Sequence, residues 1–248
     1  MRIVVWNANG GVHQKLRYLT EEIAPDIAVI SECAAPEILI RKGLRDLRPS
    51  GLVWIGNDPQ KGLAVFSFNQ FEVRRAPSVD DRLQWIAPVE VSGPVDFRLL
   101  GVWAMNHRAR DAHPERPNCP DPLTALDVYR DWYSGHPLVM AGDFNHNVIW
   151  DRPRATERNH SRTITACSEA GLVSAYHEWT GEDHGEELTP TIYWRNRTED
   201  GPRYHIDYAF VPREWMSSIT SLTVGSYADW VGSKRSDHVP VVIDFDLY

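Results

Sequence analysis

The sequence has no long hydrophobic run and few cysteines. None of its apolar stretches approaches the roughly 20 residues needed to span a bilayer, and it opens on strand-like residues 2–6 rather than a basic and apolar leader. Cys33, Cys119 and Cys167 form no CxxC pair, so neither a disulfide framework nor a cysteine-based zinc site is indicated. We therefore expect a soluble, cytoplasmic protein without membrane contact.

Positive charge is also scarce. The chain has 26 Lys and Arg against 34 Asp and Glu, a formal net charge of −8. Such a surface as a whole does not attract phosphate backbones, so any contact with nucleic acid has to be local. Acidic groups that bind a cation are neutralised in the working protein, so the charge argues against a passive DNA-binding protein more than against a metalloenzyme.

The remaining composition is that of a globular protein. Hydrophobic residues make up 42% and charged residues 24% of the 248 residues, and no linker, repeat or low-complexity segment divides the chain. We predict one domain over residues 1–248 and expect a monomer.

Apolar runs between polar, glycine or proline segments predict strands. They lie at residues 2–6, 26–31, 51–55, 62–68, 85–91, 97–104, 137–142 and 239–245, with shorter ones near 172, 191, 205 and 219. Amphipathic patterns predict helices around residues 16–23, 123–133 and 162–170. The mixture indicates an α/β fold, with two packed sheets and helices outside them.

Polar clusters flank several of the predicted strands. They are WNANG at 6–10, ISE at 30–32, GDFN at 142–145, HIDY at 205–208 and SDHVP at 236–240. Together they supply four carboxylates, several amides and two histidines. Mg²⁺ and Mn²⁺ prefer oxygen ligands, and one or two carboxylates plus a substrate phosphate can hold them. Glu32 and Asp237 suit that role, while Asp143, His238 and the amides suit the orientation of a water and the neutralisation of charge on phosphorus.

Five motifs in this order resemble the endonuclease/exonuclease/phosphatase superfamily, also called the exonuclease III-like or deoxyribonuclease I-like fold. They are WNANG at 6–10, SEC at 31–33, GDFN at 142–145, HIDYAFV at 205–211 and SDHVPV at 236–241. The resemblance implies a four-layer α/β sandwich, with the site at one edge where strand ends of both sheets meet. It also implies hydrolysis of a phosphodiester by direct water attack on phosphorus, with one or two Mg or Mn ions.

The resemblance assigns a role to each motif position. Asn7 and Glu32 are implied to belong to the metal and phosphate site, with Glu32 as the main metal carboxylate and Asp237 completing it. Asp143 is implied to orient or deprotonate the attacking water, and Asn145 to hold phosphate or metal. We expect the metal ligands among these five residues.

A histidine is implied at the reacting phosphate. His238 would contact it, oriented through its other ring nitrogen by Asp207, and such a pairing favours the charged imidazole. Many members place a second histidine or tyrosine at the end of the central strand. Trp103 stands near that place here, followed by Asn106 and His107, so these three are candidate substrate contacts and the second phosphate contact is left open.

Two locally basic loops are candidates for substrate recognition. They are residues 106–122 and residues 147–162, and the second carries Trp150, Arg152 and Arg154. Arginine beside an exposed aromatic suits phosphate contact and base stacking. Solvated loops without such a role are the alternative.

Other polar residues are less informative. Asn9 is a further candidate substrate contact, and so is His205, which shares a strand face with Asp207 but equally suits the sheet edge. We expect His146 and His160 on the surface. We expect residues 182–187 to form a solvated turn, and Trp194 to pack in the core.

A nuclease acting on DNA or RNA is the favoured function, because the WNANG opening resembles the exonuclease III branch more than the lipid phosphatases. The first alternative is a phosphoesterase for a small, non-polymeric phosphoester, which the overall acidity favours. The second is a catalytically silent binding module, which the presence of every expected carboxylate disfavours.

Overall fold

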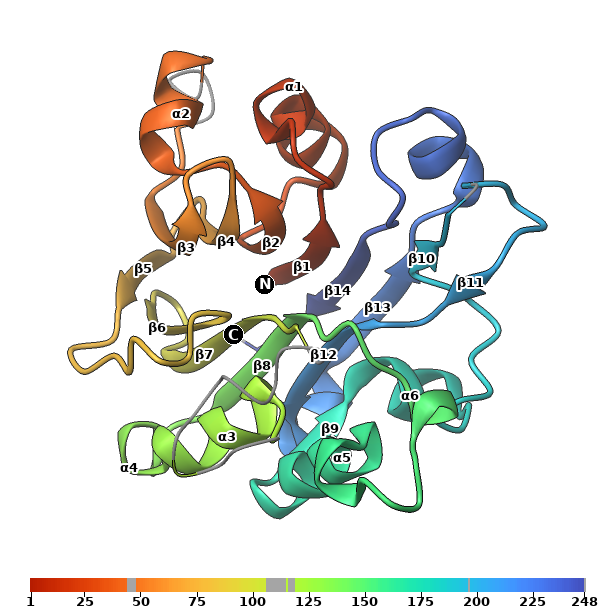
Figure 1. Ribbon diagram of the computed structural model, residues 1–248. Helices are drawn as coiled ribbons and strands as arrows, with labels where there is room; N and C mark the ends of the chain where they lie inside the picture. Colours follow the sequence, from red (N-terminus) through yellow and green to blue (C-terminus); the bar gives the residue numbers. More distant parts are fainter. Residues whose placement is uncertain (44–47, 106–114, 116–118, 196, 248) are drawn as a thin grey trace.

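Two six-stranded sheets pack face to face at the centre of the computed structural model (Figure 1), which describes residues 1–43, 48–105, 115, 119–195 and 197–247. In spatial order the first sheet contains β13 (Ile219–Val224), β14 (Val241–Phe245), β1 (Arg2–Asn7), β2 (Ile27–Cys33), β4 (Lys61–Ser67) and β3 (Gly51–Asp58). The second contains β5 (Glu72–Arg75), β6 (Ile86–Ser92), β7 (Phe97–Trp103), β8 (Leu138–Asp143), β12 (Asp207–Pro212) and β9 (Leu172–Ser174). A ribbon of β10 (Ile192–Tyr193) and β11 (Arg203–Tyr204) is separate from both.

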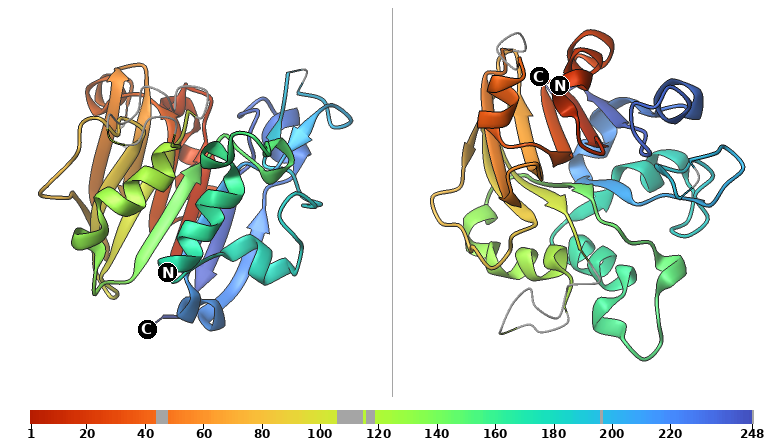
Figure 2. Two further views of the ribbon diagram at one scale, coloured as in Figure 1. Left: turned by 60° about the horizontal axis from the view of Figure 1, so that its bottom comes forward. Right: turned by 45° about the horizontal axis from the view of Figure 1, so that its top comes forward.

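Helices cover the outer faces of the two sheets (Figures 1 and 2). Against the first sheet lie α1 (Val12–Arg17), its π-helical continuation (Tyr18–Ile23), α2 (Pro36–Arg41) and a π-helical turn (Ala228–Gly232). Against the second lie α3 (Asp121–Val128), α4 (Arg130–Tyr133) and α5 (His160–Glu169), with α6 (Ala175–Thr180) beside β9 and β12. Short 3₁₀ turns occur at Val148–Trp150, Thr156–Arg158 and Arg213–Ser218. None of the described helices is long and apolar enough to cross a bilayer.

Alternation along the central strands explains their continuous apolar runs. In β1, Ile3 and Val5 face the second sheet, while Val4 and Trp6 face the helices. A strand that is covered on both faces has no polar side to its period-two pattern. The predicted four-layer α/β sandwich is confirmed.

Most predicted elements are present, and those missed are short. The strands β5 and β11 and the helices α2 and α6 have six residues or fewer, too short for a period to emerge. The helix predicted over 123–133 is divided at Tyr129, which caps α3 with a non-helical ψ of 11°.

Gly142 allows β8 to lie directly against β7. Its φ is +149°, and a Cβ at this position would lie 1.9 Å from the carbonyl oxygen of Val102. Only a residue without a side chain fits such an approach. Because Asp143 follows at once, this glycine sets where that carboxylate enters the edge of the sheet.

We expect Gly142→Ala to lower the free energy of unfolding by about 3 kcal/mol, because neighbouring backbone has to move. Gly135→Ala is the matched control. Its φ is +78° with nothing within 4 Å of the added Cβ, so it should cost only about 1–2 kcal/mol, the strain of the left-handed conformation. Urea unfolding of both variants measures the difference, and equal losses would contradict the role of the close approach.

Candidate active site

The motif residues meet at one edge of the two sheets because of strand direction. Parallel β1 and β2 end together, with Asn7 opposite Ser31. In the second sheet β8 ends at Asp143, opposite Asp207, which starts antiparallel β12. Strand β14 runs antiparallel to β1, so His238, just before it, reaches the same edge.

Glu32 is turned out of β2 by a β-bulge between Ser31 and Cys33. Its φ is +55°, a conformation that is uncommon for a residue other than glycine and that often marks a functional position. Its carboxylate is 19% exposed and lies 2.6 Å from Nζ of Lys61. The bulge thus presents one carboxylate at the surface edge, with a cation beside it.

Asn7 connects the two sheets through its side-chain amide. Nδ2 donates to Oδ2 of Asp143 at 2.9 Å and lies 3.5 Å from Oε1 of Glu32, while Oδ1 accepts the N–H of Asn9 at 2.9 Å. The amide nitrogen therefore faces both carboxylates. In this arrangement Asn7 positions the acidic groups, and Asn9 acts through its backbone.

Asp143 is buried and hydrogen-bonded at both oxygens. Asn145 donates its backbone N–H to Oδ1 at 2.8 Å and its Nδ2 to Oδ2 at 3.0 Å, with a φ of +48° that folds the chain back. Burial and the charge of Asp207 raise the pKa of Asp143 to about 7, against the opposing effects of His238 and Asn7. A carboxyl group that titrates near neutral pH is suited to accept a proton.

His238 and Asp207 form a buried pair. Nδ1 of His238 lies 2.8 Å from Oδ2 of Asp207, which is fully buried, and the N–H of Asp207 is held by Oγ1 of Thr191 at 3.0 Å. Burial alone would lower the pKa of His238, but the charge and hydrogen bond of Asp207 outweigh it and raise the pKa to about 9. The ring is therefore an imidazolium at neutral pH.

Asp237 lies beside the pair of His238 and Asp207 and forms an ion pair with an arginine. Its Oδ2 is 3.1 Å from Nη2 of Arg197, and its side chain is 24% exposed. Ser236 ties this segment to β1, because its Oγ donates to the carbonyl of Asn7 at 2.7 Å and accepts the N–H of His238 at 3.1 Å.

Sequence reasoning did not find the cations around these carboxylates. Lys61 and Arg197 form the ion pairs with Glu32 and Asp237. Lys15 donates to the carbonyls of Ala8 and Gly10, and burial lowers its pKa to about 8, opposed by the charge of Asp237. No local pattern marks them, since each comes from a segment distant in sequence from the carboxylate that it faces.

The acidic groups fit a hard divalent cation. Glu32 and Asp237 present partly buried carboxylates at the edge, and the amide nitrogen of Asn7 lies between Glu32 and the buried Asp143. Oxygen donors of this kind are what Mg²⁺ and Mn²⁺ prefer. The amides of Asn7 and Asn145 point their N–H groups at Asp143, which is a positioning role.

Two expected substrate contacts have buried side chains, although Trp103 pairs with Asp143 at the end of β7. Trp103 is 5% exposed and packs edge-on against Trp85 between the sheets, so it is a core residue. His205 is buried on the side of His177, at 5.9 Å between ring centroids, because the chain is irregular between β11 and β12 and the period of two does not extend to it. Asn106 and His107 lie outside the described residues.

The loop that starts at Asn147 is partly exposed, as expected. Arg152 and Arg154 are at the surface, and the exposed Trp150 packs edge-on against Tyr204 at 4.8 Å between centroids. Trp194 is 45% exposed, so the expectation of core packing was wrong.

A cavity of about 390 Å³ next to the site is lined by Met105, Asn145, Trp150, Ile192, Trp194, Tyr204 and Ile206.

Two further expectations were wrong. His160 is 2% exposed, since it stacks on Tyr208 at 4.8 Å between ring centroids. The segment 182–187 is not simply solvated, because the carboxylate of Glu187 is only 5% exposed and lies against His177.

Solved structures with the same fold are nucleases and a phosphatase. A 3′–5′ exonuclease (NExo) from Neisseria meningitidis has 22% identity and a TM-score of 0.72, over 99% of this chain and 100% of that one. A 3′ phosphatase NExo from Neisseria bound to a product DNA hairpin has 21% identity and a TM-score of 0.70, over 99% of both chains. An AP endonuclease from Archaeoglobus fulgidus has 15% identity and a TM-score of 0.68, over 100% of both chains. Among curated proteins, none matches this chain.

The family model named Endonuclease/Exonuclease/phosphatase family matches residues 4–238. That range includes all the motif residues from Asn7 to His238 that converge at the edge of the two sheets. The predicted family, fold and enzyme class are confirmed. The chain belongs to the endonuclease/exonuclease/phosphatase family and is a hydrolytic enzyme of that type.

Proposed function

We propose that the protein is a divalent-metal-dependent nuclease that cleaves a phosphodiester by direct water attack on phosphorus. The observation that carries the proposal is the convergence of Asp143, Asp207 and His238, whose ligand atoms lie within 4.8 Å of one another in a buried site. Asp143 is suited to accept a proton, and His238 is a cation held in place by Asp207. Hydrolysis requires both a proton acceptor and a stabilising positive charge.

Asp143 acts on the water. Its pKa of about 7 leaves it partly ionised at neutral pH, and Asn7 and Asn145 fix its two oxygens. A water held by the carboxylate is thereby aimed in one direction. As its oxygen bonds to phosphorus, its proton passes to Asp143, the P–O bond to the leaving group breaks, and the leaving oxygen takes a proton from solvent. The fixed geometry removes the orientational cost of the step.

His238 acts on the phosphate. Asp207 occupies Nδ1, so the proton on Nε2 is available to a phosphate oxygen on which negative charge accumulates. The imidazolium is charged before substrate arrives, so no reorganisation is needed at the moment of reaction. Asp207 does not meet the substrate and is a positioning residue.

Glu32 and Asp237 would hold the divalent cation. When bound there, Mg²⁺ or Mn²⁺ supplies positive charge that neutralises phosphate oxygens. Lys61 and Arg197 now neutralise these carboxylates. With a cation bound there, Lys61 and Arg197 would be free to contact phosphate oxygens of the substrate.

A polynucleotide substrate is supported by the aromatic cavity and the arginines beside it. Trp150, Trp194 and Tyr204 offer ring surfaces next to Asn145, and Arg152 and Arg154 are exposed nearby in sequence. Stacking on such rings contributes about 1–3 kcal/mol per base. NExo with its DNA hairpin is a structural neighbour that favours DNA. A small phosphoester is the second candidate, favoured by the net charge of −8.

We expect Asp143→Asn and His238→Ala each to lower turnover by about 100-fold or more, because each removes a proton-transfer or charge-stabilising group. The assay is a panel of single- and double-stranded DNA and RNA, beside bis-p-nitrophenyl phosphate, with Mg²⁺, Mn²⁺ or EDTA. Glu214→Gln, an exposed carboxyl change, is the control. If only the small ester is hydrolysed, the protein is a small-molecule phosphoesterase and not a nuclease. Activity in EDTA would contradict metal dependence.

The His238 pair predicts a pH dependence. Activity should fall above about pH 9, where the imidazolium loses its proton. The same raised pKa stabilises the fold fully below the ordinary value of 6.5, and this contribution is lost as pH rises through about 9. In Asp207→Asn the charge of Asp207, which is the main opposition to burial, is lost, so the pKa of His238 should fall and the falling limb of the pH–rate profile should move to lower pH. An unmoved limb would assign the titration to another group.

We expect Glu32→Gln to weaken Mn²⁺ binding by about tenfold or more, because a charged oxygen ligand becomes a neutral amide. Isothermal titration calorimetry measures the affinity directly. The control is Glu37→Gln, an exposed carboxylate on α2, which should bind like the wild type. Equal affinities for all three proteins would remove Glu32 from the metal site.

We expect the double change Arg152→Ala and Arg154→Ala to raise KM for long strands and to leave the small ester unaffected. Each lost phosphate contact should also flatten the slope of log affinity against log salt by roughly 0.9. The exposed Arg74→Ala is the control. If the slope of log affinity against log salt is unchanged, the loop is a solvated loop that does not contact the substrate.

A further inference from the structure

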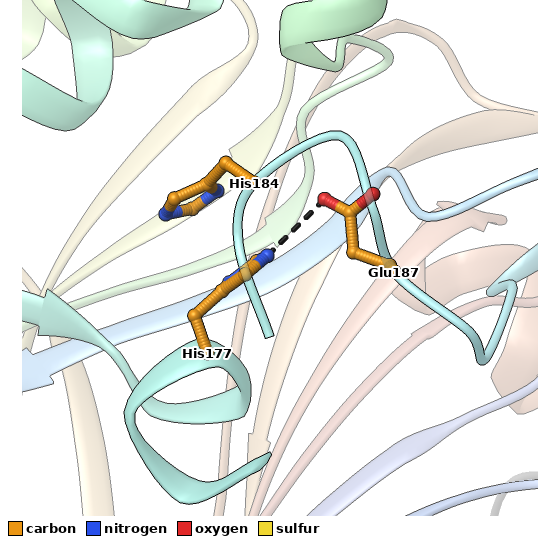
Figure 3. A group of neighbouring side chains, drawn as sticks. All are labelled: His177, His184 and Glu187. Carbon is orange, nitrogen blue, oxygen red and sulfur yellow. Dashed lines mark hydrogen bonds and ion pairs between the residues drawn. The ribbon is translucent and has the colours of Figure 1, made fainter. Parts of the chain in front are cut away.

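A second polar cluster lies beside α6, outside the candidate active site. Five histidines form a connected group of ring contacts around Tyr208, and they are His146, His160, His177, His184 and His205. His177 belongs to α6, and His184 and Glu187 to the loop that follows it (Figure 3). The nuclease mechanism uses none of them.

Two of these histidines and a neighbouring glutamate bring metal-ligating atoms together. One atom each of His177, His184 and Glu187 lies within 4.8 Å of the others. Nε2 of His177 is 3.1 Å from Oε1 of Glu187, and the two imidazoles stack at 3.5 Å between centroids. Figure 3 shows the carboxylate facing the ring of His177, with His184 alongside. This spacing is within the span of ligands that share one cation.

Outer partners hold two of the three ligands. Oγ of Ser174 is 2.7 Å from Nδ1 of His177, which leaves Nε2 directed at Glu187. Nδ2 of Asn147 donates to Oε1 of Glu187 at 3.0 Å. Metal-binding histidines and carboxylates in proteins are oriented by outer hydrogen bonds of this kind.

Buried ring nitrogens without a partner are the second observation. In the part of the chain that the structure describes, Nδ1 of His184, Nε2 of His160 and Nε2 of His205 have no hydrogen-bond partner. His160 and His205 are each 2% exposed. Nδ1 of His205 is taken by the carbonyl of Thr189 at 2.8 Å, so its Nε2 carries a lone pair. Buried polar atoms of this kind normally find a partner.

A cavity of about 410 Å³ that His177 and His184 line offers a path of entry to the cluster.

We propose that His177, His184 and Glu187 form a second metal site, which binds a nitrogen-preferring divalent cation of the zinc class. Two imidazoles and one carboxylate are a donor set typical of Zn²⁺, in contrast to the oxygen-only set at Glu32 and Asp237. The cation ties the loop after α6 to the helix. That loop leads to Thr191, whose hydroxyl accepts the N–H groups of Ile206 and Asp207.

The test is zinc content. Full-length protein is loaded with ZnCl₂ in excess Mg²⁺, which fills the oxygen site, then gel-filtered and measured by mass spectrometry of the metal. We expect one zinc ion per chain. His184→Ala and Glu187→Gln should each reduce the retained zinc by about tenfold, whereas the exposed His136→Ala should retain it. No zinc above buffer in the wild type, or equal zinc in all variants, would overturn the proposal.

A second pair of measurements separates this site from the active site. Glu32→Gln should keep its zinc, and a loss there would place the ion at the oxygen site and overturn the proposal. Cobalt supplies a readout that does not depend on activity. Co²⁺ in a site with nitrogen ligands should give a visible absorption band that disappears when zinc is added. The band should be absent in Glu187→Gln. This variant keeps the shape of the side chain, so it tests the site even if His184→Ala does not fold.

Discussion

The hydrogen bond from Asn7 to Asp143 is the contact on which the site depends. It joins the end of β1 in one sheet to the end of β8 in the other. The same amide nitrogen lies near Glu32, so a single side chain sets the spacing between a surface carboxylate and a buried one. Its own position is set by Ser236, which bonds to its carbonyl oxygen. The positions of Glu32, Asp143 and the segment before His238 are therefore all tied to Asn7.

Burial gives these groups different tasks. Asp143, Asp207 and His238 are all almost completely shielded from water, and shielding penalises each charge. Pairing compensates that penalty for His238, through the carboxylate of Asp207, and leaves Asp143 with the raised pKa. The two neighbouring carboxyl groups thus differ in surroundings, because Asp207 faces an imidazolium and Asp143 faces the amides of Asn7 and Asn145.

Sequence patterns predicted the parts of the site that strands deliver. Asn7, Glu32 and Asp143 follow apolar runs, and parallel or antiparallel pairing then brings their ends together. The patterns did not predict Lys61 or Arg197, because these reach the site by tertiary contact alone. The histidine cluster was hidden for a similar reason. Its members come from α5, α6 and three loops, and neither length nor period marks them as neighbours.

The pairing of the first strand with the last has a consequence for folding. In the first sheet Val4 lies opposite Val242, and His238 stands just ahead of that pairing. Contacts between segments this far apart in sequence form late, because closing the loop between them costs entropy. A growing chain can form its N-terminal strands and helices before the segment that carries His238 has been synthesised. The edge where Asn7, Asp143 and His238 meet is therefore complete only once β14 has paired with β1.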